Sequence, residues 1–339
     1  MPIMPRADPL PVVGITMGDP AGIGPEIIAR ALTDPGVAAR ARCVVYGDAR
    51  VMERALALTG AAAAAGAIQL VDLANADPAA FPTGRVSALC GRASWEYVKA
   101  AANAALAGGL DAVATAPLNK EAVAAARVPH VGHTEMLGAL ARVENPLTMF
   151  ETLGLRVFFL SRHVSLRQAC ELVLRPQIVD CLRRCAAALA RLGIQGAIAV
   201  AGLNPHCGEH GLFGDEEGRE IQPAIAEARA LGIAVEGPLG ADSVFHLART
   251  GRYAAVLSLY HDQGHIACKT LDFQRTVSLT LGLPFLRTSV DHGTAFDIAW
   301  KGKASAVSMS EAIYAAARYA KSYRGEVVPP GRGSTARTP

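Results

Sequence analysis

Short apolar segments that favour β-strands alternate with segments of helical character along most of the chain. Such alternation is typical of an α/β fold with a largely parallel sheet. Strands are predicted over 12–16, 43–46, 69–71, 112–115, 147–151, 155–160, 197–202, 254–259 and 277–281. Helices are predicted from Pro25, over 51–65, from Ser94 as N-cap to 108, and over 165–173, 176–192, 215–231 and 310–321.

Length and composition exclude several classes of protein. The 339 residues fit two domains or one large unit, and 51% hydrophobic residues exclude a mainly disordered chain. A net charge of +3 and 5% aromatic residues lead us to expect no nucleic-acid partner. No apolar run is long enough for a membrane span or a signal peptide, so we expect no membrane association. The seven cysteines form no CxxC pair, which favours the cytoplasm.

Three histidines occupy similar positions in this pattern. His163, His206 and His261 each follow an apolar segment that is predicted to be a strand. In open α/β sheets, sites form beyond the carboxyl ends of strands. Three imidazoles around one metal would leave positions for water or substrate. The alternative is three unrelated loop histidines. Asp262 is either a carboxylate supporting this site or the N-cap of a helix.

A glycine-rich turn joins the first strand to the first helix. The segment Gly18-Asp-Pro-Ala-Gly-Ile-Gly-Pro25 is neither a GxGxxG fingerprint nor a P-loop. Its glycines permit close backbone approach to a ligand, and the alternative is a purely structural turn.

Several polar residues are candidates for binding an anion. His133 and Thr134 precede a predicted helix, whose free N–H groups favour anions, although Thr134 could simply cap that helix. Lys269 and Arg287 are either surface cations or partners of an anionic substrate. Lys120, at another loop-to-helix junction, can act as an acid or base if it is buried.

Five motifs together resemble the 4-hydroxythreonine-4-phosphate dehydrogenase (PdxA) family, from about Val12 to Ala320. They are Gly18-Asp-Pro-Ala-Gly-Ile-Gly-Pro25, Gly132-His-Thr-Glu135, Gly202-Leu-Asn-Pro-His206, Tyr260-His-Asp-Gln-Gly264 and Arg287-Thr-Ser-Val-Asp-His-Gly-Thr-Ala295. The resemblance implies two α/β/α domains around a cleft, similar to isopropylmalate and isocitrate dehydrogenases. It places 1–130 and 295–325 in the first domain, on the NAD side. It places 131–294 in the second, with the metal ligands and dimer interface, and leaves 326–339 as a mobile tail.

The resemblance also implies an activity and a set of site residues. The activity is oxidation and decarboxylation of a phosphorylated 3-hydroxy acid in pyridoxine biosynthesis or a related branch. NAD or NADP and one divalent metal (Zn, Mg, Mn or Co) would serve a homodimer with shared active sites. The implied metal ligands are His163, His206 and His261, and the base candidates are Lys120 and Asp262. The substrate residues would be His133, Thr134, Lys269, Ser278 and Arg287, and the cofactor residues His292, Gly293, Thr294, Ala295 and Asp297.

Two features bear on the choice of substrate. Ser278 stands where the family commonly has an Asn substrate ligand, and Gly264-His265-Ile266 looks more like the branch that oxidises 4-phospho-threonate or 4-phospho-erythronate. One alternative is a cis-dihydrodiol dehydrogenase of the terephthalate type. Others are a metal-dependent phosphohydrolase and a non-catalytic ligand sensor that uses the cleft and needs no metal.

Overall fold

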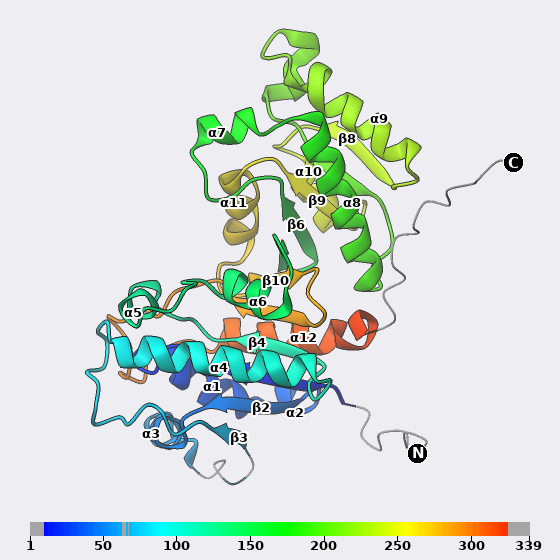
Figure 1. Cartoon of the computed structure of the whole chain (residues 1–339). Helices are drawn as coiled ribbons and strands as arrows, with labels where there is room; N and C mark the ends of the chain where they lie inside the picture. Colours follow the sequence, from blue (N-terminus) through cyan, green and yellow to red (C-terminus); the bar gives the residue numbers. More distant parts are fainter. Residues whose placement is uncertain (1–9, 63–65, 67, 325–339) are drawn as a thin grey trace, which may run out of the picture.

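One continuous sheet organises the whole molecule (Figure 1). The computed structural model describes residues 10–62, 66 and 68–324, so the tail 326–339 lies outside the described residues. The strands are β1 (Val12–Thr16), β2 (Arg42–Gly47), β3 (Gln69–Asp72), β4 (Ala112–Thr115), β5 (Leu147–Thr152), β6 (Leu155–Phe159), β7 (Ile198–Ala201), β8 (Val235–Leu239), β9 (Ala255–Ser258), β10 (Val277–Leu281) and β11 (Leu286–Val290).

The helices alternate with these strands, as predicted. They are α1 (Gly24–Leu32), α2 (Pro35–Ala38), α3 (Ala49–Leu58), α4 (Ala88–Leu106), α5 (Lys120–Ala125), α6 (His133–Ala141), α7 (Leu166–Glu171), α8 (Arg175–Arg191), α9 (Gln222–Ala230), α10 (Val244–Arg249), α11 (His261–Leu271) and α12 (Val307–Arg324), with the short segments η2 (Pro205–Gly211) and η3 (Glu217–Ile221). Among the described residues, no helix combines the length and the apolar character required to cross a membrane.

The strand order is β3-β2-β1-β4-β11-β10-β5-β6-β9-β7-β8. The first five strands run parallel to their neighbours, and so do the last four. Only β10 and β5 make the antiparallel pairings, with β11, with each other and with β6. The predicted α/β class with a largely parallel sheet is therefore confirmed.

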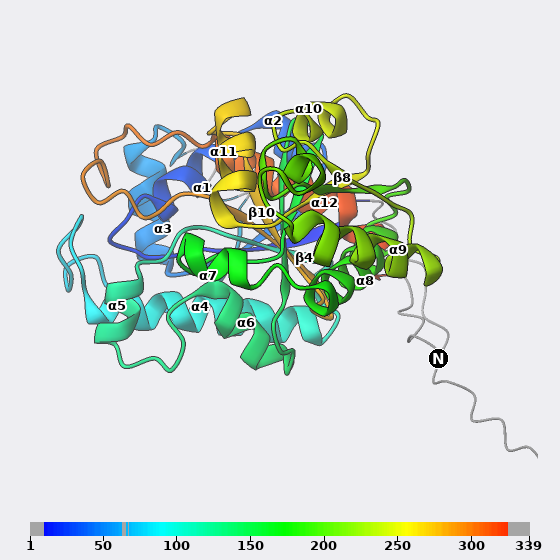
Figure 2. The same cartoon turned by 90° about the horizontal axis from the view of Figure 1, so that it is seen from above.

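Helices cover both faces of the sheet (Figure 2). In the half that contains the first strands, α4 lies on one face, and α1 and α12 lie on the other (Figures 1 and 2). In the other half, α10 and α11 lie on the face opposite α8 and α9 (Figure 2). Buried aliphatic side chains of the strands fill the space between the sheet and these helices, which is why the strands appear in the sequence as apolar runs.

Several predicted helices differ in their bounds, and two of them differ for reasons that the structure shows. Helix α4 begins at Ala88, and Ser87 rather than Ser94 is its N-cap. Ser94 is buried inside the helix, where its hydroxyl donates to the carbonyls of Cys90 (2.7 Å) and Gly18 (3.1 Å), so it joins α4 to the glycine-rich turn. The helix predicted over 51–65 ends at Leu58, and 63–65 lie outside the described residues.

Candidate active site

The three predicted histidines lie along one edge of the sheet. Strands β6, β9 and β7 are neighbours and run parallel. His163 follows β6, His261 is the first residue of α11 after β9, and His206 follows β7. Each histidine thus follows a strand, as predicted, and the three strands are neighbours in the sheet.

The side chains come together only in part. The rings of His163 and His261 have centroids 6.0 Å apart, whereas His206 makes its ring contact with Phe213 at 6.4 Å. In the described part of the chain, no group of three or more His, Cys, Asp or Glu side chains could hold a metal ion. Two imidazoles on adjacent strand ends fit two ligands of a divalent metal, and such a site needs further donors.

His261 is oriented by its neighbours on α11. Its Nδ1 lies 2.6 Å from Oδ1 of Asp262, a contact that is typical of carboxylates supporting metal-binding histidines. The helix N-cap is Tyr260, so the capping role considered for Asp262 is wrong. The ring of His265 stacks on that of His261, with centroids 3.7 Å apart. Burial lowers the pKa of His265 to about 3, and the charge of His261 contributes to this shift. The i, i+4 spacing on one helix face is the sequence signal that could have found this pair.

Two residues not singled out from the sequence hold the His206 loop in place. The buried carboxylate of Glu217 accepts hydrogen bonds from the backbone N–H groups of Leu203 (2.8 Å) and Asn204 (2.7 Å). Gln263 accepts from Leu259 N–H (2.8 Å) and donates to the Gly202 carbonyl (2.8 Å), which joins the ends of β9 and β7. The loop itself has left-handed backbone at His206 (φ 52°), a conformation that is uncommon for non-glycine residues and concentrates at functional sites.

Arg287 is the buried cation of the site. It lies in β11, and its guanidinium donates to Oγ1 of Thr115 (2.7 and 3.1 Å) and Oγ1 of Thr280 (3.0 Å). Burial lowers the pKa of Arg287 to about 9, so the group stays protonated at neutral pH. Neutral hydroxyl partners leave its positive charge available to an anionic ligand.

His133 and Thr134 begin helix α6. Burial holds the pKa of His133 well below its usual range, and the charge of Arg287 adds to this effect. The Nε2 atom of His133 is buried and has no hydrogen-bond partner among the described residues. The N-cap of α6 is Gly132 and no side chain caps the helix, so the simple capping role for Thr134 is wrong. An unpartnered imidazole nitrogen at a helix start fits a ligand-binding role.

Lys269 and Ser278 lie on elements next to Arg287. Lys269 Nζ pairs with Oδ2 of Asp291 at 2.8 Å, so its charge is already compensated. Ser278 lies in β10, paired with Ser289 of β11 in the sheet register, and Thr280 on the same strand binds Arg287.

Two further cations lie around His163. Burial lowers the pKa of His163, and the positive charges of Arg162 and Lys120 lower it further. Lys120 is the first residue of α5, and Asn119 caps that helix. Lys120 is exposed, so the burial on which its role as an acid or base depends is not met in the single chain. Of the candidate bases, Lys120 thus acts electrostatically on His163, and Asp262 contacts His261. Arg162 did not stand out in the sequence, because no motif marks it.

The expected cofactor residues form a loop against the glycine-rich turn. Thr294 accepts a hydrogen bond from Ile23 N–H at 3.0 Å, and a Cβ on Gly22 would lie 2.9 Å from Thr294 Cβ. Trp300 donates to the Pro20 carbonyl at 3.0 Å. His292, Gly293, Ala295 and Asp297 lie in the same connection between β11 and α12. The glycines of the turn are thus required by packing within the chain, which favours the structural interpretation of that motif.

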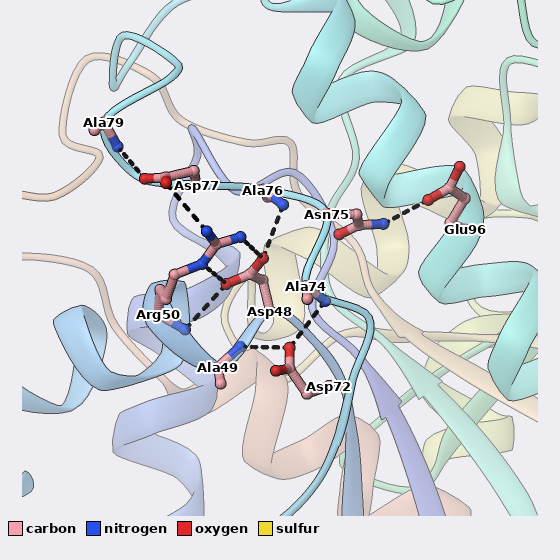
Figure 3. A network of polar contacts seen from close by, with 10 residues as sticks. All are labelled: Asp48, Ala49, Arg50, Asp72, Ala74, Asn75, Ala76, Asp77, Ala79 and Glu96. Atoms are coloured by element: carbon pink, nitrogen blue, oxygen red, sulfur yellow. Dashed lines mark hydrogen bonds and ion pairs between the residues drawn. The ribbon is translucent and has the colours of Figure 1, made fainter.

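A network of carboxylates fixes the segment that follows β3 (Figure 3). The buried Asp48 accepts from Ala76 N–H (2.8 Å) and pairs with Arg50 (2.8 Å), which also reaches Asp77 (3.1 Å). Further along this segment, Gly84 N–H donates to the Ala21 carbonyl at 2.8 Å. The network therefore ties the ends of β2 and β3 to the glycine-rich turn.

Comparisons with known proteins show which family the chain is similar to. The family described as "Pyridoxal phosphate biosynthetic protein PdxA" matches residues 39–316. A protein of Symbiobacterium thermophilum named "Putative D-threonate 4-phosphate dehydrogenase" is 56% identical over 331 residues, with 94% of this chain and 99% of that protein covered. The crystal structure of 4-hydroxythreonine-4-phosphate dehydrogenase from Klebsiella pneumoniae has a TM-score of 0.83 and 42% identity, and covers 91% of this chain and 99% of its own. A terephthalate 1,2-cis-dihydrodioldehydrogenase from Burkholderia xenovorans is more distant, with a TM-score of 0.63, 30% identity and 91% and 98% covered.

Proposed function

The chain belongs to the pyridoxal phosphate biosynthetic protein PdxA family, and from this membership we propose that it is an NAD-dependent dehydrogenase of a phosphorylated 3-hydroxy acid. The observation that carries the proposal is the row of His163, His261 and His206 at the ends of three adjacent parallel strands. The buried Arg287 supports an anionic substrate.

We propose 4-phospho-D-threonate or 4-phospho-erythronate as the substrate, ahead of 4-phosphooxy-L-threonine. The name of the relative with 56% identity and the presence of Ser278 support this choice. The dihydrodiol alternative has less support, because the dehydrogenase of that type is only 30% identical.

The chain's own residues hold the substrate and move its proton. Arg287 and His133 bind one anionic group, Thr134 adds a hydroxyl, and Lys269 and Ser278 complete this side. Lys120 or Asp262 takes the proton of the C3 hydroxyl as hydride leaves C3 for NAD. The product is a β-keto acid, whose C1–C2 bond breaks to release carbon dioxide, and the enolate that is left takes up a proton from water at C2. A divalent metal held by His163, His206 and His261 would act as a Lewis acid on the substrate oxygen.

The cofactor takes the loop that contains His292, Gly293, Thr294, Ala295 and Asp297. Its rigid support by the glycine-rich turn is consistent with a binding role. We place the enzyme in the cytoplasm, because all seven cysteines are free thiols.

We further propose that the active protein is a homodimer with shared sites. One chain alone does not bring His206 to the His163–His261 pair, so the third imidazole would come from a second copy. Each histidine segment also exposes a large apolar side chain, such as Leu166 (63%), Leu212 (72%) or Ile266 (62%). We propose that the dimer covers these side chains.

A screen of NADH absorbance tests the function. It compares 4-phospho-D-threonate, 4-phospho-D-erythronate, 4-phosphooxy-L-threonine and a terephthalate dihydrodiol, each with Zn²⁺, Mg²⁺, Mn²⁺ or Co²⁺ and after metal removal. We expect metal-dependent NADH formation with a phosphorylated acid, and none with His206→Ala. NADH from the dihydrodiol alone, or release of phosphate without NADH, would overturn the proposal. Binding of ligands without turnover would indicate a sensor instead.

A further inference from the structure

Arg162 is a cation of the site that the proposed mechanism leaves unused. It lies in the loop between β6 and α7, immediately before His163, and is partly buried. With Thr134 and Glu135, it lines a cavity of about 770 Å³ between α6, the end of β6 and α8. Arg162 therefore lines the same cavity as Thr134, one of the proposed ligand-binding residues.

The guanidinium of Arg162 has no hydrogen bond or ion pair with any described residue, although other arginines nearby do. Arg287 donates to two threonine hydroxyls, and Arg184, on the wall of the same cavity, donates to the Asn145 carbonyl. Removing a charge from water without a partner is costly. A partly buried, unpaired guanidinium that opens onto a cavity is therefore suited to an anion that arrives with the substrate.

The charges in the neighbourhood of Arg162 are consistent with an anionic ligand. Lys269 is compensated by Asp291 at 2.8 Å, but Arg162, Arg287 and Lys120 have no ion pair among the described residues. Glu135 acts electrostatically on both Arg162 and Arg287, Asp291 acts on Arg287, and Asp180 also lines the cavity. Arg162 therefore has an acidic group nearby but no direct ion pair among the described residues, which leaves its charge available to an anionic group of the substrate.

We propose that Arg162 binds the carboxylate end of the substrate and makes the site select 2-hydroxy acids over the corresponding 2-amino acids. This inference rests on the proposed function and deepens it. Both classes of substrate carry a phosphate and a carboxylate, but the amino acid also carries an ammonium group at C2. That ammonium is next to the carboxylate and would approach Arg162 as a like charge in a cavity partly shielded from water.

Substitution of Arg162 tests the inference through a ratio of rates. We compare wild type, Arg162→Gln and Arg162→Lys with 4-phospho-D-threonate and 4-phosphooxy-L-threonine. Loss of a charge-assisted hydrogen bond predicts that Arg162→Gln lowers kcat/KM for the hydroxy acid by about 10- to 100-fold. The amino acid should lose much less, so the preference falls at least about tenfold. Arg162→Lys keeps the charge and should keep most of the preference. Differences in stereochemistry between the two substrates cancel, because each variant is compared with wild type.

Arg184→Gln is the matched control, since Arg184 lines the same cavity but already has a partner. It should leave the preference, and the KM for NAD, unchanged. Calorimetric titration of 4-phospho-D-threonate should show weaker binding to Arg162→Gln, and thermal unfolding confirms that both variants fold. Equal losses for both substrates, or no loss for either, would overturn the inference. If wild type oxidises neither substrate, the proposed function itself has failed.

Discussion

At the scale of single residues, the glycine-rich turn contains one buried carboxyl group with an unusual environment. Asp19 is fully buried; its Oδ1 accepts a hydrogen bond from Ala21 N–H at 2.8 Å, and its Oδ2 has no partner. Burial raises the pKa of Asp19 to about 6, against the effect of that hydrogen bond. The titratable neighbour of Asp19 is Cys90. Burial raises the pKa of Cys90 to about 12, and the charge of Asp19 contributes to this rise.

The environment of Asp19 predicts a pH-dependent stability. A folded pKa above the unfolded value favours the protonated form, so stability is complete below about pH 4 and is lost as pH rises through about 6. The loss reaches about 3 kcal/mol at neutral pH, because each pKa unit is worth about 1.4 kcal/mol. Denaturant unfolding of wild type and Asp19→Asn at several pH values, without ligands, measures it. The two free-energy profiles should diverge between about pH 4 and about pH 8, and parallel profiles would contradict the prediction.

The residues of the site were predictable to different degrees. The strand-end histidines could be found, because strand ends are visible as the ends of apolar runs. Glu217 and Gln263 could not, since their importance lies in which backbone groups they bind after folding. Arg162 resembles any loop arginine until the fold shows that it has no partner.

At the scale of elements, the sequence predicted which segments are helices better than where they begin. The Ser165 cap of α7 was predictable because Gln168 completes a capping box that is visible in the sequence. The start of α4 was not, because both Ser87 and Ser94 are good caps and only the tertiary fold buries Ser94.

The contact between the glycine-rich turn and the cofactor loop can be tested with Gly22→Ala. The new Cβ would lie 2.9 Å from Thr294 Cβ and 3.0 Å from the Thr294 carbonyl oxygen, so the loop must shift. We expect the KM for NAD to rise by about tenfold with little change for the phosphorylated substrate. Gly218→Ala is the control, because nothing lies within 4 Å of its added Cβ. A higher KM for the substrate alone would show that the loop serves the other ligand.

At the scale of the whole molecule, the α/β class followed from the sequence, but the strand order did not. The antiparallel strands β10 and β5 in the middle of the sheet depend on long-range pairing that no local pattern encodes. The third imidazole of the metal site also depends on the whole assembly, because we propose that a second copy of the chain supplies it.

The dimer can be tested at Ile266, which is 62% exposed on α11. A charge buried in an apolar interface without a partner is strongly unfavourable, so Ile266→Asp should weaken dimerisation roughly a hundredfold. Analytical sedimentation would measure the mass of the variant. Metal binding and activity should decrease as the dimer dissociates, while the circular dichroism spectrum of the variant stays that of the wild type. Leu231→Asp, at the end of α9 and 57% exposed, should remain dimeric. A fully dimeric, active Ile266→Asp protein would contradict both the interface and the shared site.

The ladder that runs from β4 through β11 and β10 to β5 also limits how the enzyme can move. The domain division that the family resemblance implies, with 1–130 and 295–325 on one side, crosses this ladder between β4 and β11. No flexible linker separates the two parts there, because adjacent strands share backbone hydrogen bonds. Any narrowing of the space between them must therefore bend or twist a hydrogen-bonded sheet, so the elasticity of the backbone opposes each opening and closing during turnover.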